Sequence, residues 1–249
     1  MITKNLNNFK ITTTKQAITS FAGLPLLLGM AKNLGLEEQL NALPLKERAR
    51  GYKPAESAFA LMGLIQSGGE ALDNISVLKG DDGLGELWGG IPAANTLGEW
   101  LRRFGCKTVH QLGRIQLATA AKVVRACKFP RVTLDVDSFF LESQKSDVEM
   151  NYEGLWGYNP VAVTCSELKM PMIGIFRKGT ASPMTNIAAL VKRAIAALPG
   201  IPLRVRSDSA GFQAKVVRVL MKKGVDFTIT MRNDENVMET IYGIPESRW

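Results

Sequence analysis

The feature that most constrains the fold is a change of periodicity at Pro130. Between residues 17 and 129 apolar side chains recur at helical spacing, interrupted by glycine and proline, which predicts a mostly helical domain. After Pro130, three short apolar runs bounded by proline, glycine or lysine predict consecutive strands at 131–140, 160–166 and 172–177. Residues 1–16 carry no acidic group and form either a loose basic arm or a short edge strand.

The second region continues with elements that alternate between helix and strand. A helix is predicted to open at Ser182, a strand spans 203–207, Ser209 can cap the next helix, and residues 225–231 alternate like an edge strand. Helices that link strands imply parallel crossovers. The resulting order, βββαβαβ, predicts an α/β domain with a mixed sheet of the ribonuclease-H-like type over residues 130–249.

The net charge and the motifs of the sequence favour some classes of function and disfavour others. The formal net charge is +8, and residues 1–129 hold 16 Lys and Arg against 10 Asp and Glu. This balance favours a polyanion such as nucleic acid as partner. Three widely spaced cysteines support neither a disulfide framework nor a zinc site, which indicates a reducing, cytoplasmic location. A phosphate-binding loop, a dinucleotide fingerprint and a histidine near the acidic residues are all missing, so ATPase, dehydrogenase and triad chemistry are disfavoured.

Three aspartates are the candidate chemical groups. Period-two alternation puts Asp135 and Asp137 on one face of the strand that also carries Val132, Leu134 and Val136 on its other face. Asp208 follows the strand at 203–207, at the carboxyl edge where open α/β sheets bind ligands.

Each acid has a purely structural alternative. The first two could pair with Arg204 or Arg206, and Asp208 could stabilise a turn or cap a helix. In a ribonuclease-H-like sheet the first and fourth strands are neighbours, which would bring Asp137 and Asp208 together. Convergent carboxylates are what Mg²⁺ requires for in-line phosphoryl transfer.

Several stretches together resemble one family, the DDE transposases of bacterial insertion sequences, in the branch with a helical N-terminal region. They are Gly23-Leu24-Pro25-Leu26, Arg50-Gly51-Tyr52, Asn95-Thr96-Leu97-Gly98, Leu101-Arg102-Arg103-Phe104, Leu134-Asp135-Val136-Asp137-Ser138, Trp156-Gly157-Tyr158-Asn159-Pro160 and Arg206-Ser207-Asp208-Ser209-Ala210-Gly211-Phe212. Each is weak alone, and their order along the chain makes the match specific.

The resemblance implies residue roles. Asp137 matches the first catalytic aspartate, with Asp135 as its alternative, and Asp208 matches the second. The third acid of the family is a glutamate in a Tyr–Arg–Glu–Lys signature, and nothing after Met231 carries that signature. Glu235, Glu239 and Glu246 remain available for this role. We therefore expect a C-terminally truncated catalytic core that binds DNA but does not cleave it alone.

The resemblance also implies an activity and its partners. It implies cleavage and strand transfer of double-stranded DNA at terminal inverted repeats, with Mg²⁺ or Mn²⁺ as cofactor, target DNA as second substrate, a possible homodimer and association with the nucleoid. The helical domain at 17–129 is expected to bind DNA through five basic residues: Arg48, Arg50, Lys53, Arg102 and Arg103. Two alternatives remain, a DNA-binding remnant without catalysis and a related nuclease.

Overall fold

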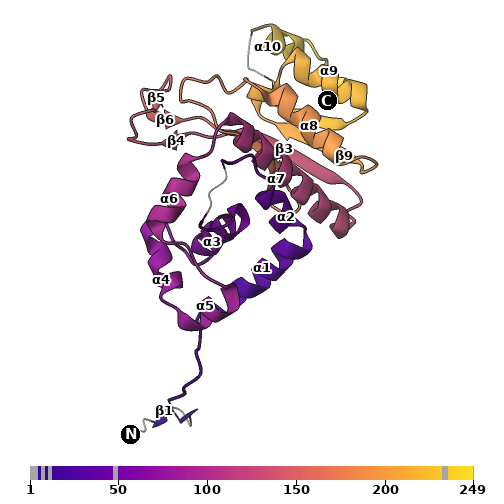
Figure 1. Cartoon of the computed structure of the whole chain (residues 1–249). Helices are drawn as coiled ribbons and strands as arrows, with labels where there is room; N and C mark the ends of the chain where they lie inside the picture. The colour runs from indigo at the N-terminus through magenta and orange to yellow at the C-terminus, as the bar shows by residue number, and fades with distance from the viewer. Residues whose placement is uncertain (1–4, 7–8, 11–12, 47–49, 232–234, 249) are drawn as a thin grey trace. The chain divides into compact units, whose positions relative to one another are not determined.

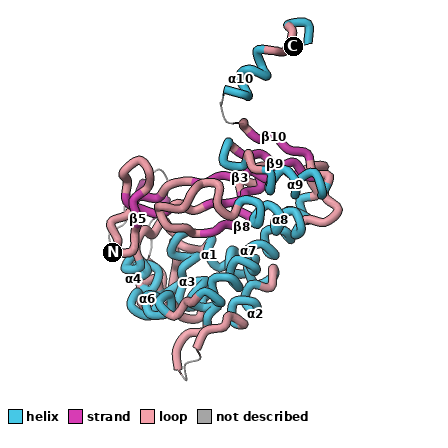
Figure 2. The backbone as a smooth tube through the Cα atoms, turned by 90° about the horizontal axis from the view of Figure 1, so that it is seen from above, coloured by secondary structure: helices cyan, strands magenta, loops and turns pink. Residues whose placement is uncertain are grey.

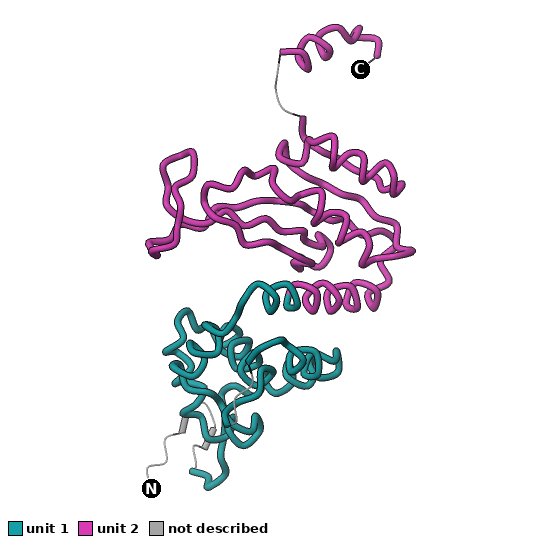
Figure 3. The backbone as a smooth tube through the Cα atoms, turned by 45° about the horizontal axis from the view of Figure 1, so that its top comes forward, with its two compact units in different colours: residues 1–112 teal, residues 113–249 magenta. Residues whose placement is uncertain are grey.

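The computed structural model describes residues 5–6, 9–10, 13–46, 50–231 and 235–248. The chain divides into two compact units, residues 1–112 and 113–249, which Figure 3 distinguishes by colour. The division falls inside the long helix α7 (Cys106–Cys127), earlier in the chain than the change of periodicity at Pro130. None of the helices in the described ranges is long and apolar enough to cross a membrane.

The first unit is helical, as predicted. The structure describes a short antiparallel pair, β1 (Asn5–Leu6) and β2 (Phe9–Lys10), and then helices that enclose a core around Leu64, Leu84 and Leu97. The helices are α1 (Gly23–Asn33), α2 (Leu36–Asn41), α3 (Pro54–Gln66), the 3₁₀ turn η1 (Leu72–Asn74), α4 (Ile75–Lys79), α5 (Asp82–Trp88), α6 (Ala94–Arg102) and the start of α7.

Local chemistry sets where these helices begin and end. Gly35 separates α1 from α2 with a φ of +74°, a left-handed conformation that glycine adopts at little cost. Helix α3 opens on Pro54, where the missing N–H costs nothing, and the Glu56 side chain accepts a hydrogen bond from the backbone N–H of Lys53 at 2.6 Å.

The second unit is built on a five-stranded sheet in the order β10-β9-β3-β7-β8. Strands β3 (Val132–Ser138), β7 (Val161–Cys165) and β8 (Met170–Ile175) pair antiparallel, whereas β9 (Leu203–Ser207) runs parallel to β3 and β10 (Asp226–Ile229) parallel to β9. The first and fourth predicted strands are therefore neighbours. This confirms the mixed sheet of the ribonuclease-H-like type.

Helices cover one face of this sheet. Helix α8 (Ile187–Ala197) packs on β7 and β8, α9 (Ala214–Lys223) packs on β10, and α7 contributes Ala120, Ala121 and Val124 to the same core. Val132, Leu134 and Val136 of β3 point into that core and are almost fully buried. The alternate residues of β3 lie on the other face, where they are half-buried or exposed.

The structure adds elements that sequence patterns had not indicated. A small sheet of β4 (Leu141–Glu142), β5 (Glu149–Met150) and β6 (Trp156–Tyr158), in the order β4-β6-β5, is inserted between β3 and β7, and Figure 2 shows it beyond one end of the central strands. A helix α10 (Glu235–Tyr242) and a 3₁₀ turn η3 (Glu246–Arg248) follow β10.

Two predicted helix starts were wrong. Helix α8 begins at Ile187, not at Ser182, because the buried guanidinium of Arg177 takes up the backbone carbonyls of the intervening loop at Ser182, Pro183 and Thr185. Helix α9 begins at Ala214, and Ser209 does not cap it. Instead, Asp208 caps a 3₁₀ turn, η2 (Ser209–Gly211), that precedes the helix.

Candidate active site

Asp137 and Asp208 occupy corresponding positions at the carboxyl ends of two neighbouring parallel strands, β3 and β9. The register of β3 with β9 runs from Val132 opposite Leu203 to Val136 opposite Ser207. Each aspartate is the next residue after the last of these pairs, at the carboxyl end of its strand. Neighbouring strands lie about 5 Å apart, so the register favours a close approach of the two carboxylates.

The Asp137 side chain is exposed, and within the described part of the chain nothing hydrogen bonds or ion-pairs with it. An exposed carboxylate without a protein partner keeps all of its oxygen lone pairs for water or a bound cation. Such a carboxylate can bind a divalent cation without first breaking an ion pair.

Asp135 is held in a different environment, two residues earlier on the same face. Its carboxylate accepts two hydrogen bonds from Arg206, at 2.6 Å from Nε and 2.8 Å from Nη2, and Arg206 also donates to the Ser166 hydroxyl at 2.9 Å. The Arg206 hydrogen bonds are the main cause that lowers the pKa of Asp135. Asp135 thus adopts the structural alternative, an ion pair across the two strands.

Asp208 has one carboxylate oxygen engaged locally. Its Oδ1 accepts a hydrogen bond from the backbone N–H of Ala210 at 3.0 Å, which fixes the side chain over the turn η2. Gly211 allows this turn to close on the strand, because a Cβ there would meet the Ser207 Oγ at 2.3 Å. The capping role that the sequence offered as an alternative is present, and a second oxygen is left for other ligands.

Sequence patterns had not pointed to two residues that lie near these acids, Glu167 and Ser166. Glu167 accepts hydrogen bonds from the Thr133 backbone N–H with both oxygens, at 2.9 and 3.0 Å, and so holds the start of β3. Ser166 supports Arg206 from the same turn. Both contacts depend on the antiparallel pairing of β7 with β3, which a linear pattern does not reveal.

The candidates for a third acid do not complete a cluster. Glu235 and Glu239 lie on α10, and Glu246 lies in η3. Within the ranges that the structure describes, no group of three or more His, Cys, Asp or Glu side chains is arranged to hold a metal ion. The third position of the site therefore has no occupant among these residues.

The basic residues expected to bind DNA lie in the first unit, and Arg48 falls outside the described residues. Arg50, Lys53 and Arg102 are exposed. Arg103 is half-buried, and its guanidinium donates a hydrogen bond to the backbone carbonyl of Lys46. Arg103 therefore also has a structural role, since it ties the end of α6 to the backbone at Lys46.

Comparison with known proteins places the chain in a family. A family model described as Transposase DDE domain group 1 matches residues 3–249. No curated protein sequence matches. Similar solved structures include a piggyBac transposase synaptic complex with hairpin DNA, at 14% identity and a TM-score of 0.42, which covers 89% of this chain and 54% of that one.

Two further structures show weaker similarity. The Drosophila P element transposase strand transfer complex is 12% identical with a TM-score of 0.36, covering 82% of this chain and 47% of that one. The Mos1 strand transfer complex is 12% identical with a TM-score of 0.28, covering 79% and 67%. The chain spans about half the length of the piggyBac chain. Because the family model covers nearly the whole sequence, the chain belongs to the DDE transposases of group 1.

Proposed function

We propose that this chain acts as a DNA transposase that cleaves and transfers DNA strands at the ends of an insertion sequence. The single observation that carries the proposal is the position of Asp137 and Asp208, each one residue beyond the last register pair of two neighbouring parallel strands. The family match supports the same chemistry. The substrates would be double-stranded DNA with terminal inverted repeats and a target duplex.

The donor set fits part of a site for a hard divalent cation. Asp137 offers a carboxylate without a protein partner, and Asp208 offers the oxygen that does not cap η2. Carboxylate oxygens are preferred ligands of Mg²⁺ and Mn²⁺. When bound, such a cation activates an attacking oxygen and stabilises the leaving oxygen of a phosphodiester.

The chain's own residues then have separate tasks. Asp137 and Asp208 would hold the cation, and η2 would fix the direction of the Asp208 side chain through the N–H of Ala210. Arg206 neutralises Asp135, which limits the negative charge that a phosphodiester has to approach. We therefore propose that Asp135 positions Arg206 and that Asp137 binds the metal ion.

The first unit would supply sequence-independent DNA binding. Arg50, Lys53 and Arg102 are exposed in that unit, and we propose that they contact DNA together with Arg48 and Arg103. Contacts to phosphates release counterions, so binding by this unit should weaken steeply with salt. Activity on paired element ends would fit a homodimer acting at the nucleoid.

A second candidate function is DNA binding without cleavage. It is favoured by the observation that, in the described ranges, no third acidic side chain joins Asp137 and Asp208 in a metal-binding group. Two carboxylates bind a cation weakly, and loss of one ligand commonly removes orders of magnitude in rate. The two candidates share the metal-binding residues and differ in catalysis.

Mn²⁺ binding followed by electron paramagnetic resonance tests the site directly. The native chain would be compared with Asp137→Asn, Asp208→Asn and the control Asp226→Asn, an exposed acid on β10 that pairs with Arg131 at 3.4 Å. We expect the two site variants to weaken Mn²⁺ binding by about tenfold or more and the control to leave it unchanged. Equal binding by all four proteins would refute the metal assignment.

A nicking assay then separates the two candidate functions. The substrate is a supercoiled plasmid that carries the ends of the element, with Mg²⁺ or Mn²⁺ present. Cleavage that requires both Asp137 and Asp208 supports the transposase. Intact Mn²⁺ binding and DNA binding without cleavage support the second candidate.

A further inference from the structure

Two long stretches of the chain after residue 99 contain no acidic residue. Residues 100–134 hold eight Lys and Arg, and residues 168–207 hold seven, without a single Asp or Glu in either. The first stretch includes all of α7 and the second all of α8. In the second unit both helices belong to the same hydrophobic core, so cationic segments far apart in sequence come together.

A groove lies between these two helices on the surface of the second unit. Its volume is about 490 Å³, and its lining consists only of basic and apolar residues: Arg114, Leu117, Ala118, Ala121, Lys122, Arg125, Arg193, Ala196 and Ala197. The small alanine side chains leave the space between the helices unfilled, which opens the groove. The apolar floor and the cationic rim are suited to a ligand with sugar-like and anionic parts.

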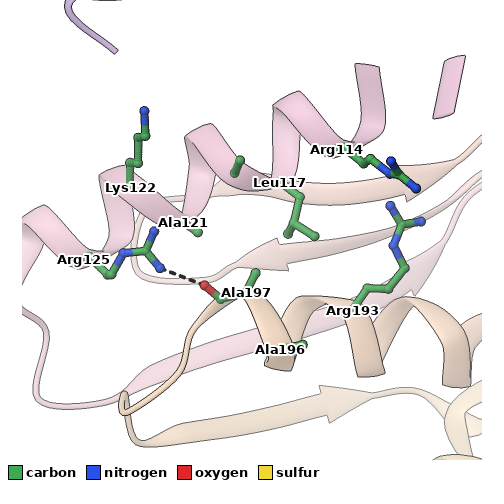
Figure 4. A pocket seen from close by; sticks show the side chains of 9 residues that line it. Arg114, Leu117, Ala121, Lys122, Arg125, Arg193, Ala196 and Ala197 are labelled. Carbon is green, nitrogen blue, oxygen red and sulfur yellow. Dashed lines mark hydrogen bonds between the residues drawn. The ribbon is translucent and has the colours of Figure 1, made fainter. Parts of the chain in front are cut away.

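The arginines are arranged around this groove from both sides. Figure 4 shows Arg114 of α7 and Arg193 of α8 with their guanidinium groups turned toward one another, and both residues line the groove. Two like charges that face each other without an acidic lining residue repel, and an anion between them would relieve that repulsion. Planar guanidinium groups bind phosphate oxygens with two parallel hydrogen bonds.

Arg125 has an additional structural role at the far end of the groove. Its Nη1 donates a hydrogen bond of 2.9 Å to the backbone carbonyl of Ala197, the last residue of α8. A cation at this place also suits the helix C-terminus. Arg125 is therefore unsuitable for a binding test, whereas Arg114 and Arg193 are suitable.

We propose that the α7–α8 groove binds the phosphodiester backbone of duplex DNA as a second, non-catalytic DNA site. The choice of DNA among polyanions rests on the proposed function, while the preference for an anion rests on the groove alone. Asp135 and Asp137 alternate with the β3 residues that contact the helices, so they lie on the opposite face of the sheet. The groove would thus hold a different DNA segment from the one at the acids.

The test is fluorescence anisotropy of a short labelled duplex with the full chain, in EDTA so that metal binding at Asp137 and Asp208 does not contribute. The groove variant is Arg114→Gln with Arg193→Gln. The charge-matched control is Lys192→Gln with Lys222→Gln, two exposed lysines on α8 and α9 that do not line the groove. Thermal melting of every variant shows whether it is folded.

We expect the groove variant to bind DNA at least about tenfold more weakly near 0.1 M salt, and the slope of log K against log salt to fall by about 1.8, the value for two lost phosphate contacts. The control pair should lose much less. Arg114→Lys with Arg193→Lys keeps both charges and should retain most of the affinity, which rules out a folding defect as the cause.

Two results would overturn the proposal. One is an equal loss of affinity in the groove variant and the control pair. The other is displacement of DNA by polyglutamate as effectively as by unlabelled duplex at equal charge, which would identify an acidic protein segment as the ligand. Loss of Mn²⁺ binding at Asp137 or Asp208 bears only on the active site, so failure there is distinguishable from failure of the groove.

Discussion

The two faces of the central sheet are formed by the same strands but differ in burial and polarity. On β3, Val132, Leu134 and Val136 are almost fully buried against helices, whereas Asp135 is half-buried in an ion pair and Asp137 is exposed. The period-two alternation thus places the core residues on one face of this seven-residue strand and both aspartates on the other. Substitutions on the two faces should therefore fail in different ways.

The largest effect should come from the helix-covered face. Leu134→Ala removes a fully buried side chain from the core and should lower the free energy of unfolding by about 3 kcal/mol. Thr164→Ala, on the other face of the neighbouring strand, should cost less than about 1 kcal/mol. Urea unfolding measures both. Similar losses would show that the two faces do not differ as described.

A smaller effect is expected at the strand ends. Gly211→Ala introduces a Cβ at 2.5 Å from the Ser207 Cβ, so the turn η2 has to shift, at a cost of about 1–3 kcal/mol. Gly113→Ala is the matched control, because the new Cβ meets nothing within 4 Å and favours helix α7.

The same two variants can show whether the turn η2 both stabilises the protein and positions Asp208 for metal binding. Gly211→Ala should weaken Mn²⁺ binding together with stability, whereas Gly113→Ala should leave Mn²⁺ binding unchanged. Unaltered metal binding in a destabilised Gly211→Ala protein would indicate that the turn does not position Asp208.

The smallest effect concerns the Asp135–Arg206 pair. Because Arg206 lowers the pKa of Asp135 in the folded protein, the pair contributes stability above the usual pKa near 3.8 and loses it as pH falls through the lowered value. Both side chains are partly exposed, at 33% and 52%, so the contribution at pH 7 should stay below about 1 kcal/mol.

Urea unfolding of the native chain and Asp135→Asn at pH 7 and pH 3 measures this contribution, and the difference should shrink on acidification. Arg206→Gln and the double variant complete a cycle that isolates the pair. A difference that grows toward pH 3 would be inconsistent with a lowered pKa.

Much of the sheet could be predicted because its pattern is local. The alternation in β3 indicates which residues face the core, and strand-linking helices imply the parallel neighbours. Which of the two aspartates pairs with which arginine could not be predicted from the pattern. Both share a face, and Arg204 and Arg206 share the corresponding face of β9, so only the register shows that Arg206 stands opposite Asp135.

The inserted sheet and the start of α8 could not be predicted from the sequence for a different reason. Strands of two or three residues carry no periodic signal, and long-range contacts hold this sheet, such as the Lys178–Glu149 ion pair at 2.6 Å. Ser182-Pro183 has the pattern of a helix start. The buried Arg177 overrides it by binding the carbonyls that follow.

The pairing of β3 with β9 also has a consequence for how the protein is made. Its ion pair joins residues 71 positions apart, whereas the first unit is assembled from helices that are near neighbours in the chain. Local contacts form quickly, and N-terminal regions fold first as a chain leaves the ribosome. The nascent protein should therefore bury the core of its helical unit before β9 emerges. Asp137 and Asp208 acquire their common edge only after β9 has been synthesised.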